Sequence, residues 1–119
     1  MNKRFLVMLA ACACLLAPAA EARSPYDGQW NITFVTHSGD CNPVYTYPVS
    51  IENGVISSPA VQTFRGNVTK AGIVRAAVAV QDRRATGSGK LMSAVGRGTW
   101  TGYSSGQRCA GAWTAQRTW

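Results

Sequence analysis

Apolar and polar residues alternate with a period of two through most of this sequence, and this pattern constrains its fold more than any other feature. Successive side chains of an extended strand point to opposite faces, so the alternation predicts strands with one apolar face. Residues 45–52 (YTYPVSIE) are one example, and the Asn53-Gly54 pair that follows them is the strongest short hairpin signal. The residues that share one face in the other segments are Trp30, Ile32 and Phe34; Phe64, Gly66 and Val68; Val74, Ala76, Val78 and Val80; Ala85, Gly87, Gly89 and Leu91; Gly98, Trp100 and Gly102; and Cys109, Gly111, Trp113 and Ala115. With a short strand at 55–57, we expect seven full strands and one short one.

These strands predict a small all-β fold without helices. Short antiparallel strands with one polar face either wrap into an up-and-down barrel or pack as two sheets. Even spacing and short turns, such as Lys70-Ala71-Gly72 and residues 81–83, favour the barrel. Pro48 lacks a backbone donor and belongs at an edge or a bulge, which favours a partly open barrel at that point. The prediction is an antiparallel meander of seven to eight strands, forming a barrel or a partly open barrel.

The first 22 residues follow a different pattern. Lys3 and Arg4 precede an apolar run that ends at Ala20-Glu21-Ala22, as in a secretory signal peptide with a small-x-small cleavage site. The apolar run is too short to span a hydrocarbon core of about 30 Å. In the alternative interpretation, Leu9-Ala10-Ala11-Cys12 is a lipobox and Cys12 is acylated, but residues 13–20 stay apolar where lipoproteins become polar. We expect a signal peptide at 1–22, no later transmembrane segment, and a single exported domain at 23–119, periplasmic or secreted.

The cysteine count supports the same cleavage site. Cleavage after Ala22 removes Cys12 and Cys14 and leaves Cys41 and Cys109, whereas cleavage before Cys12 leaves Cys14 as an odd thiol. Exported proteins reach compartments in which disulfides persist, so Cys41 and Cys109 are expected to form one disulfide. A bridge over such a long loop is worth about 4 kcal/mol in the chain-entropy account.

A Gly-x-Trp unit occurs three times, at Gly28, Gly98 and Gly111. Residues two apart share a strand face, so each glycine is expected to leave space beside an inward ring. The rings either fill a narrow barrel or line a mouth for an apolar or planar ligand, and small barrels favour filling. The candidate binding residues on the predicted inner face are Trp30, Tyr45, Tyr47, Trp100 and Trp113.

Several motifs together carry a resemblance. They are Tyr26-Asp27-Gly28-x-Trp30, Gly39-Asp40-Cys41, Tyr45-x-Tyr47-Pro48-Val49-x-Ile51-x-Asn53-Gly54, Ala85-Thr86-Gly87-Ser88-Gly89, Gly98-x-Trp100-Thr101-Gly102 and Cys109-x-Gly111-x-Trp113-x-Ala115-x-Arg117. In this order they resemble a group of short exported bacterial β-proteins of uncharacterised function, over nearly the whole of 23–119. The resemblance implies export and a β fold, and it implies no activity.

A looser similarity links the chain to lipocalin- and avidin-like barrels. In those barrels a Gly-x-Trp on the first strand packs beneath a basic residue of the last strand, which implies that Arg117 stacks on Trp30. The biotin-site pattern and the second lipocalin motif are absent from the sequence. Bacterial barrel-type protease inhibitors share the small size, export, one disulfide and the Gly-x-Trp unit.

Catalytic and metal chemistry find little support in the sequence. His37, Ser38 and Asp40 lie within four residues, but a triad needs groups that converge in space, and a turn at Gly39-Asp40 is the simpler interpretation. One histidine and two oxidised cysteines make a poor metal site, so we expect neither metal nor cofactor. We expect no enzymatic activity.

The positive charge does not indicate a nucleic-acid groove. Removal of residues 1–22 takes away Lys3, Arg4 and Glu21, so the net charge falls from +7 to +6. The basic residues spread over outward faces and one turn, which favours solubility or attraction to anionic envelope polymers. The leading hypothesis is a binding protein that uses its open barrel end, or the loops 36–43 and 103–107, to hold a small ligand or an envelope protein. The alternatives are an inhibitor of another enzyme that acts through residues 23–27 or a rim loop, and a structural or adhesive envelope component.

Overall fold

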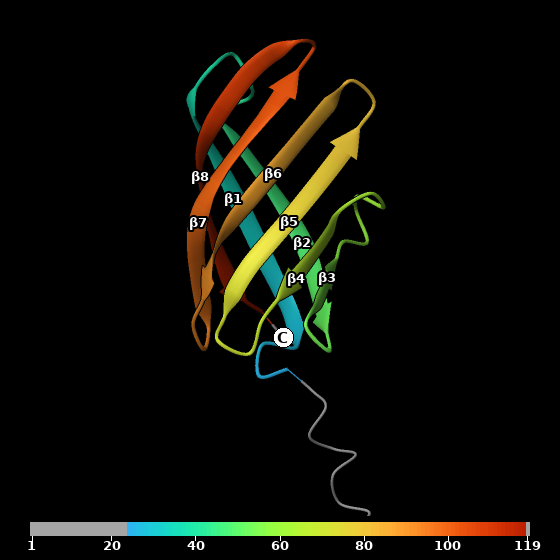
Figure 1. The fold of residues 1–119 in the computed structure, drawn as a ribbon, viewed down its shortest axis with the longest axis vertical. Coiled ribbons are helices and arrows are strands. Elements are labelled where there is room, and N and C mark those ends of the chain that lie inside the picture. Colours follow the sequence, from blue (N-terminus) through green and yellow to red (C-terminus); the bar gives the residue numbers. More distant parts are fainter. Residues whose placement is uncertain (1–23, 119) are drawn as a thin grey trace, which may run out of the picture.

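The computed structural model describes residues 24–118, which form one closed antiparallel barrel (Figure 1). Each strand pairs with the next along the chain, and the first pairs with the last. The predicted all-β meander is therefore confirmed as a barrel, while the predicted signal peptide lies outside the described residues. Within this part of the chain, no helix is long and apolar enough to cross a membrane. The strands are β1 (Gly28–Ser38), β2 (Val44–Glu52), β3 (Val55–Ser57), β4 (Arg65–Val68), β5 (Ile73–Val80), β6 (Arg83–Leu91), β7 (Val95–Ser104) and β8 (Gln107–Arg117).

Pairing of β1 with β8 closes the barrel. The register places Trp30 opposite Arg117, and the guanidinium carbon of Arg117 lies 4.9 Å from the centroid of the Trp30 ring. Arg117 also donates a hydrogen bond to the backbone oxygen of Pro25 at 2.9 Å. The Trp30 indole nitrogen donates to the backbone oxygen of Tyr26 at 2.9 Å. The predicted stacking of Arg117 on Trp30 is confirmed, and both side chains fasten the N-terminal segment to the base of the barrel.

The strand boundaries differ from the predicted ones at four places. Phe64 precedes β4 and is buried in the connecting segment, so β4 is a second short strand beside β3. β1 continues to Ser38, and the predicted loop at 103–107 shrinks to a turn at residues 105–106. The predicted turn at 81–83 contains only residues 81 and 82, with Gln81 at φ 56°, so Arg83 begins β6. Two-residue hairpin turns accept positive φ, as at Gln81, Ser105 and Gly106, and extend the ladder on both sides, which explains the longer β6, β7 and β8.

The short strands β3 and β4 leave a notch in one wall of the barrel. β2 pairs with β3 only from Ser50 to Glu52, and β4 pairs with β5 only as far as Ala77. In the described chain, the remaining parts of β2 and β5 therefore have no strand between them. These are their upper parts, at the end of the barrel away from Gly28 and Arg117 (top of Figure 1). Pro48 lies on this stretch of β2 and pairs only with Asn31 of β1. The predicted edge position of Pro48 is thus found locally within a barrel that is closed as a whole.

Two hydroxyl groups of the segment 58–64 replace part of the missing ladder. The buried Ser58 donates its Oγ hydrogen to the backbone oxygen of Pro48 at 2.7 Å and accepts from the backbone of Ala60 and Val61. Thr63 donates its hydroxyl hydrogen to the backbone oxygen of Ala79 and accepts from the Ala79 nitrogen at 3.4 Å. Unpaired backbone groups are costly when buried, so these bonds stabilise the notch.

The lower interior is filled by two of the predicted rings. Trp30 and Trp113 are 1% and 4% exposed, and the voids beside them measure only about 10 and 30 Å³. The indole nitrogen of Trp113 donates to the backbone oxygen of Ser88 at 3.2 Å, which satisfies its one polar atom. These two rings therefore act as core. The rest of the buried apolar core is Ile32, Val49, Ile51, Ile56, Phe64, Val68, Val74, Leu91, Trp100, Cys109 and Ala115.

Two of the three Gly-x-Trp glycines make room for rings as expected. A β-carbon at Gly98 would lie 2.6 Å from the Trp113 ring, and one at Gly111 would lie 3.0 Å from Nε1 of Trp100. In both cases the ring comes from the neighbouring strand. Gly28 is different, because nothing lies within 4 Å of a β-carbon built there. Its φ of 138° instead requires glycine, so the packing explanation is wrong at this position.

Candidate functional site

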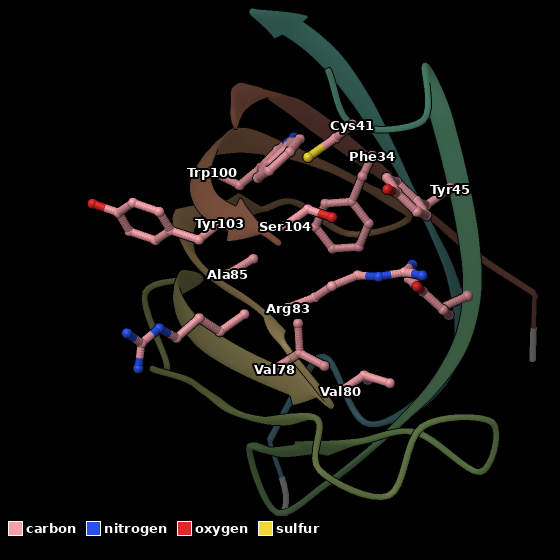
Figure 2. Close-up of a pocket in the computed structure, with 12 residues that line it drawn as sticks. Phe34, Cys41, Tyr45, Val78, Val80, Arg83, Ala85, Trp100, Tyr103 and Ser104 are labelled. Carbon is pink, nitrogen blue, oxygen red and sulfur yellow. The ribbon is translucent and has the colours of Figure 1, made fainter. Parts of the chain in front are cut away.

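A pocket opens at the end of the barrel opposite Gly28 and Arg117, with a volume of about 120 Å³ (Figure 2). The upper ends of β1, β2, β5, β6 and β7 surround it, together with the loop between β1 and β2. Its lining is mostly aromatic and aliphatic. The lining residues are Phe34, Cys41, Tyr45, Tyr47, Val78, Val80, Arg83, Arg84, Ala85, Trp100, Tyr103 and Ser104.

Phe34 is at the centre of the aromatic lining. Its ring meets Trp100 at 6.3 Å between centroids and 90°, and it meets Tyr47 at 6.0 Å and 65°. Tyr47 in turn stacks on Tyr45 with an interplanar angle of 10°. Edge-to-face and stacked pairs hold rings in defined orientations. The four rings come from β1, β2 and β7, so the barrel fixes the shape of the pocket before any ligand arrives.

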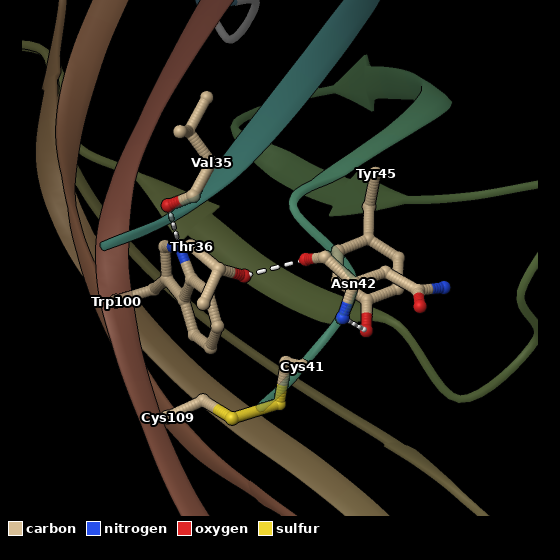
Figure 3. The surroundings of a disulfide bond; sticks show 7 residues. All are labelled: Val35, Thr36, Cys41, Asn42, Tyr45, Trp100 and Cys109. Atoms are coloured by element: carbon tan, nitrogen blue, oxygen red, sulfur yellow. Dashed lines mark hydrogen bonds between the residues drawn. A yellow bond between two sulfur atoms is a disulfide. The ribbon is translucent and has the colours of Figure 1, made fainter. Parts of the chain in front are cut away.

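A disulfide holds the loop over this pocket (Figure 3). Cys41 and Cys109 are bonded as predicted, and Cys109 is fully buried. Gly39, at φ 92°, passes so close to β8 that a β-carbon there would lie 2.8 Å from the Cys109 sulfur. A side chain at Gly39 would therefore push the loop away from the disulfide.

Hydrogen bonds fix the same loop to β1 and β2. The Thr36 hydroxyl donates to the backbone oxygen of Asn42 at 2.7 Å, and the Thr36 nitrogen donates to the oxygen of Pro43 at 2.9 Å. The Asn42 nitrogen donates to the Tyr45 hydroxyl at 3.1 Å (Figure 3). Below them, the Trp100 indole nitrogen donates to the backbone oxygen of Val35 at 3.2 Å. Loop and pocket wall are thus one connected unit.

Arg83 carries the charge that reaches into the pocket. It has the same strand parity as Ala85, and its side chain extends across the pocket between Phe34 and Val78 (Figure 2). Arg84, one residue further along β6, has the opposite parity and pairs with Tyr103 at the rim. No acidic side chain of the described chain lines the pocket. The site is therefore an apolar pocket that is crossed by the guanidinium group of Arg83.

The predicted binding residues divide between this pocket and the core. Tyr45, Tyr47 and Trp100 line the pocket, whereas Trp30 and Trp113 lie in the filled lower half. Sequence reasoning missed Phe34, Val78, Val80 and Arg83 as pocket residues. Strand parity carried the signal for all four, because each shares a face with residues already predicted to point inward.

His37, Ser38 and Asp40 do not converge on the pocket. All three are exposed, at the end of β1 and in the loop after it. Residues 24–118 contain no cluster of three or more side chains suited to hold a metal ion. Within the described chain, the pocket at the barrel mouth is the candidate site that the interior of the barrel offers. Comparison of the whole chain with known protein families, with curated proteins and with solved structures finds no match.

Proposed function

We propose that this protein is an exported, non-enzymatic binding protein that holds one small apolar or planar group in the mouth of its barrel. The observation that carries the proposal is the contrast between the two ends of the interior. The upper end keeps a preformed aromatic pocket of about 120 Å³, while the void directly below it measures about 30 Å³ and the one at the lower end about 10 Å³. A protein that needed its rings only as core would gain stability by filling the upper end too.

The pocket volume limits the size of the group that is bound. A cavity of about 150 Å³ lined by apolar side chains takes a benzene molecule, whereas typical pockets for larger ligands measure about 300–1,000 Å³. At about 120 Å³, this pocket fits a single ring or a short branched alkyl group. That group belongs to a small molecule, or it is one side chain of an envelope protein.

Ligand titration of the protein with small neutral aromatics tests the proposal. Trp100 lines the pocket and reports occupancy, so indole-free rings such as benzyl alcohol are expected to change tryptophan fluorescence saturably and to raise the melting temperature by mass action. In Val78→Phe an added ring fills the pocket, and we expect binding to be lost while the fold remains. Ala77→Phe is the matched control, because Ala77 is exposed on the outer face of the same strand.

The outcome separates small ligands from protein partners. A broad set of apolar rings that causes neither a fluorescence change nor a thermal shift would reject the small-ligand hypothesis and favour a partner side chain. Equal loss of binding in Val78→Phe and Ala77→Phe would place the binding site elsewhere.

Export is tested separately, by intact-mass measurement of the protein purified from its native envelope. We expect a chain that starts at Arg23 and has no thiol that reacts before reduction. A chain that begins with acylated Cys12, or two thiols that alkylate without reduction, would contradict this part of the proposal.

A further inference from the structure

Arg83 is an unusual residue for the inner face of this barrel. The other inward positions of β6 hold alanine, glycine and leucine, and the inner face of β5 opposite is aliphatic. The register places Arg83 between Val80 of β5 and Ser104 of β7, at the top of the pocket. An arginine here puts a permanent positive charge next to the Phe34 ring, where a ligand would lie.

The acidic residues of the described chain are all directed elsewhere. Asp27 accepts hydrogen bonds from the backbone of Asn53 and Gly54 at the base of the barrel, and Glu52 lies at the same end. Asp82 precedes Arg83 but accepts a hydrogen bond from the Ser105 hydroxyl at 2.8 Å. Asp40 is exposed in the loop between β1 and β2. None of these carboxylates is among the groups that line the pocket.

The polar side chains of the lining have one property in common. Arginine can only donate hydrogen bonds, and serine and tyrosine hydroxyls can donate as well as accept. Tyr45 already accepts from the Asn42 nitrogen, so its own hydrogen is available to a ligand acceptor. Apart from the weakly accepting disulfide sulfur of Cys41, the lining contains no side chain that can only accept. Its polar side therefore suits a ligand group that accepts hydrogen bonds and carries negative charge.

We propose, building on the function proposed above, that the natural ligand group is a small apolar acid whose ring or branched alkyl body sits against Phe34 and Trp100 while its carboxylate pairs with Arg83. The planar fork of a guanidinium matches a carboxylate with two parallel hydrogen bonds. Because the apolar floor holds one end of the ligand and the cation the other, the pocket fixes its orientation. A ligand with an ammonium group in place of the carboxylate meets the like charge of Arg83 and no carboxylate of the lining, so it binds more weakly.

Three ligands of nearly equal size measure this selectivity: benzoate, benzamide and benzylammonium. For the full mature protein, calorimetry or tryptophan quenching is expected to show benzoate binding at least about fivefold more tightly than benzamide. That ratio corresponds to about 1 kcal/mol, the upper end for an exposed ion pair, and Arg83 is itself exposed. Benzylammonium is expected to bind most weakly.

Arg83→Gln removes the charge and keeps a polar side chain of similar length. We expect the preference for benzoate over benzamide to fall to about one while the affinity for benzamide stays unchanged, and Arg83→Lys to retain part of the preference. Arg108→Gln is the control, because it changes the net charge equally at the same end of the barrel but lies outside the pocket lining. Circular dichroism melts confirm that the variants are folded.

The possible failures are distinguishable. If neither benzoate nor benzamide binds, the small-ligand part of the proposed function is wrong, and the acid preference is rejected with it. If both bind equally to the wild-type protein, that function stands and the acid preference is wrong. If Arg108→Gln removes the preference as effectively as Arg83→Gln, the preference comes from the overall charge, and the assignment to Arg83 is overturned.

Discussion

Replacing Gly98 with alanine would measure how tightly the lower interior is packed around Trp113. Gly98 faces inward from β7, opposite Trp113 of β8 in the register. A β-carbon at Gly98 would lie 2.6 Å from both Cε2 and Nε1 of the Trp113 ring and would also meet the backbone oxygen of Ser88. The Trp113 nitrogen donates its hydrogen bond to that same oxygen at 3.2 Å. The ring therefore cannot move away from the added methyl group without weakening this bond.

The expected loss follows from three contributions. Overpacking of a core costs about 1–3 kcal/mol, and a lost neutral hydrogen bond costs about 1 kcal/mol. The lower chain entropy of alanine in the unfolded state offsets about 0.5–1 kcal/mol. We expect Gly98→Ala to lower the free energy of unfolding by about 2–3 kcal/mol, which corresponds to a fall in Tm of roughly 10–20 °C for a domain of this size.

Gly87 provides a matched control next to the same ring. A β-carbon there would lie 3.6 Å from Nε1 of Trp113 and 3.4 Å from Cβ of Trp100, and its tightest contact would be the backbone oxygen of Thr99 at 3.1 Å. Because that contact needs a shift of only a few tenths of an ångström, Gly87→Ala is expected to cost about 1 kcal/mol, clearly less than Gly98→Ala. Urea unfolding followed by far-ultraviolet circular dichroism avoids the change in tryptophan emission. Combining Gly98→Ala with Trp113→Phe should relieve the clash and give a coupling energy of about 1 kcal/mol or more. Equal losses at the two glycines, or no coupling, would refute the packing argument.

Other substitutions and one chemical treatment test the remaining structural features. Arg117→Ala is expected to lower the free energy of unfolding by about 1–2 kcal/mol, because the arginine no longer stacks on the Trp30 indole and no longer buries its aliphatic stem. Arg97→Ala, on the outer face, is the control and should leave denaturant melts nearly unchanged. Ser58→Ala should cost about 1–2 kcal/mol, because the buried Ser58 hydroxyl bonds the backbone of Pro48, Ala60 and Val61 and all three groups lose that partner. Ser57→Ala, on an exposed site, should cost almost nothing, and similar melts for both variants would contradict the role of Ser58 in the notch. Reduction of the disulfide, whose cysteines are 68 residues apart, should lower stability by about 4 kcal/mol in thermal melts with and without reductant, and an unchanged Tm would show that the bridge does not stabilise the fold.

Much of this architecture is predictable from the sequence, because alternate residues of each strand in a closed barrel face the interior and the residues between them face outward. The alternation around Trp30, Val49 and Trp100 assigns their faces, and the close approach of Gly98 to Trp113 follows from the same alternation. Parity gives the wrong reason for the glycine at the first residue of β1, because the backbone conformation of Gly28, and not packing, requires it.

Strand parity does not predict that one half of the interior is filled and the other half is open. Trp113 and Tyr47 both face inward, yet one is buried in the core and the other lines the pocket. Their height along the barrel axis depends on the stagger between strands, which arises from pairing across the whole barrel. Arg83 was missed for a local reason, because its charge suggested a turn residue, whereas a shorter turn placed it on the inner face of β6.

The ladder between β1 and β8 also determines when the protein can finish folding. It joins Trp30 to Arg117, so no local hairpin can form it, and topologies dominated by such distant pairings fold in milliseconds to seconds. Until the ladder forms, both strands present unpaired edges, and such edges template aggregation between chains. A chain that ends before the eleven residues of β8 keeps an exposed edge on β1 and another on β7 permanently. When the final strand pairs with both β7 and β1, it removes these two edges together.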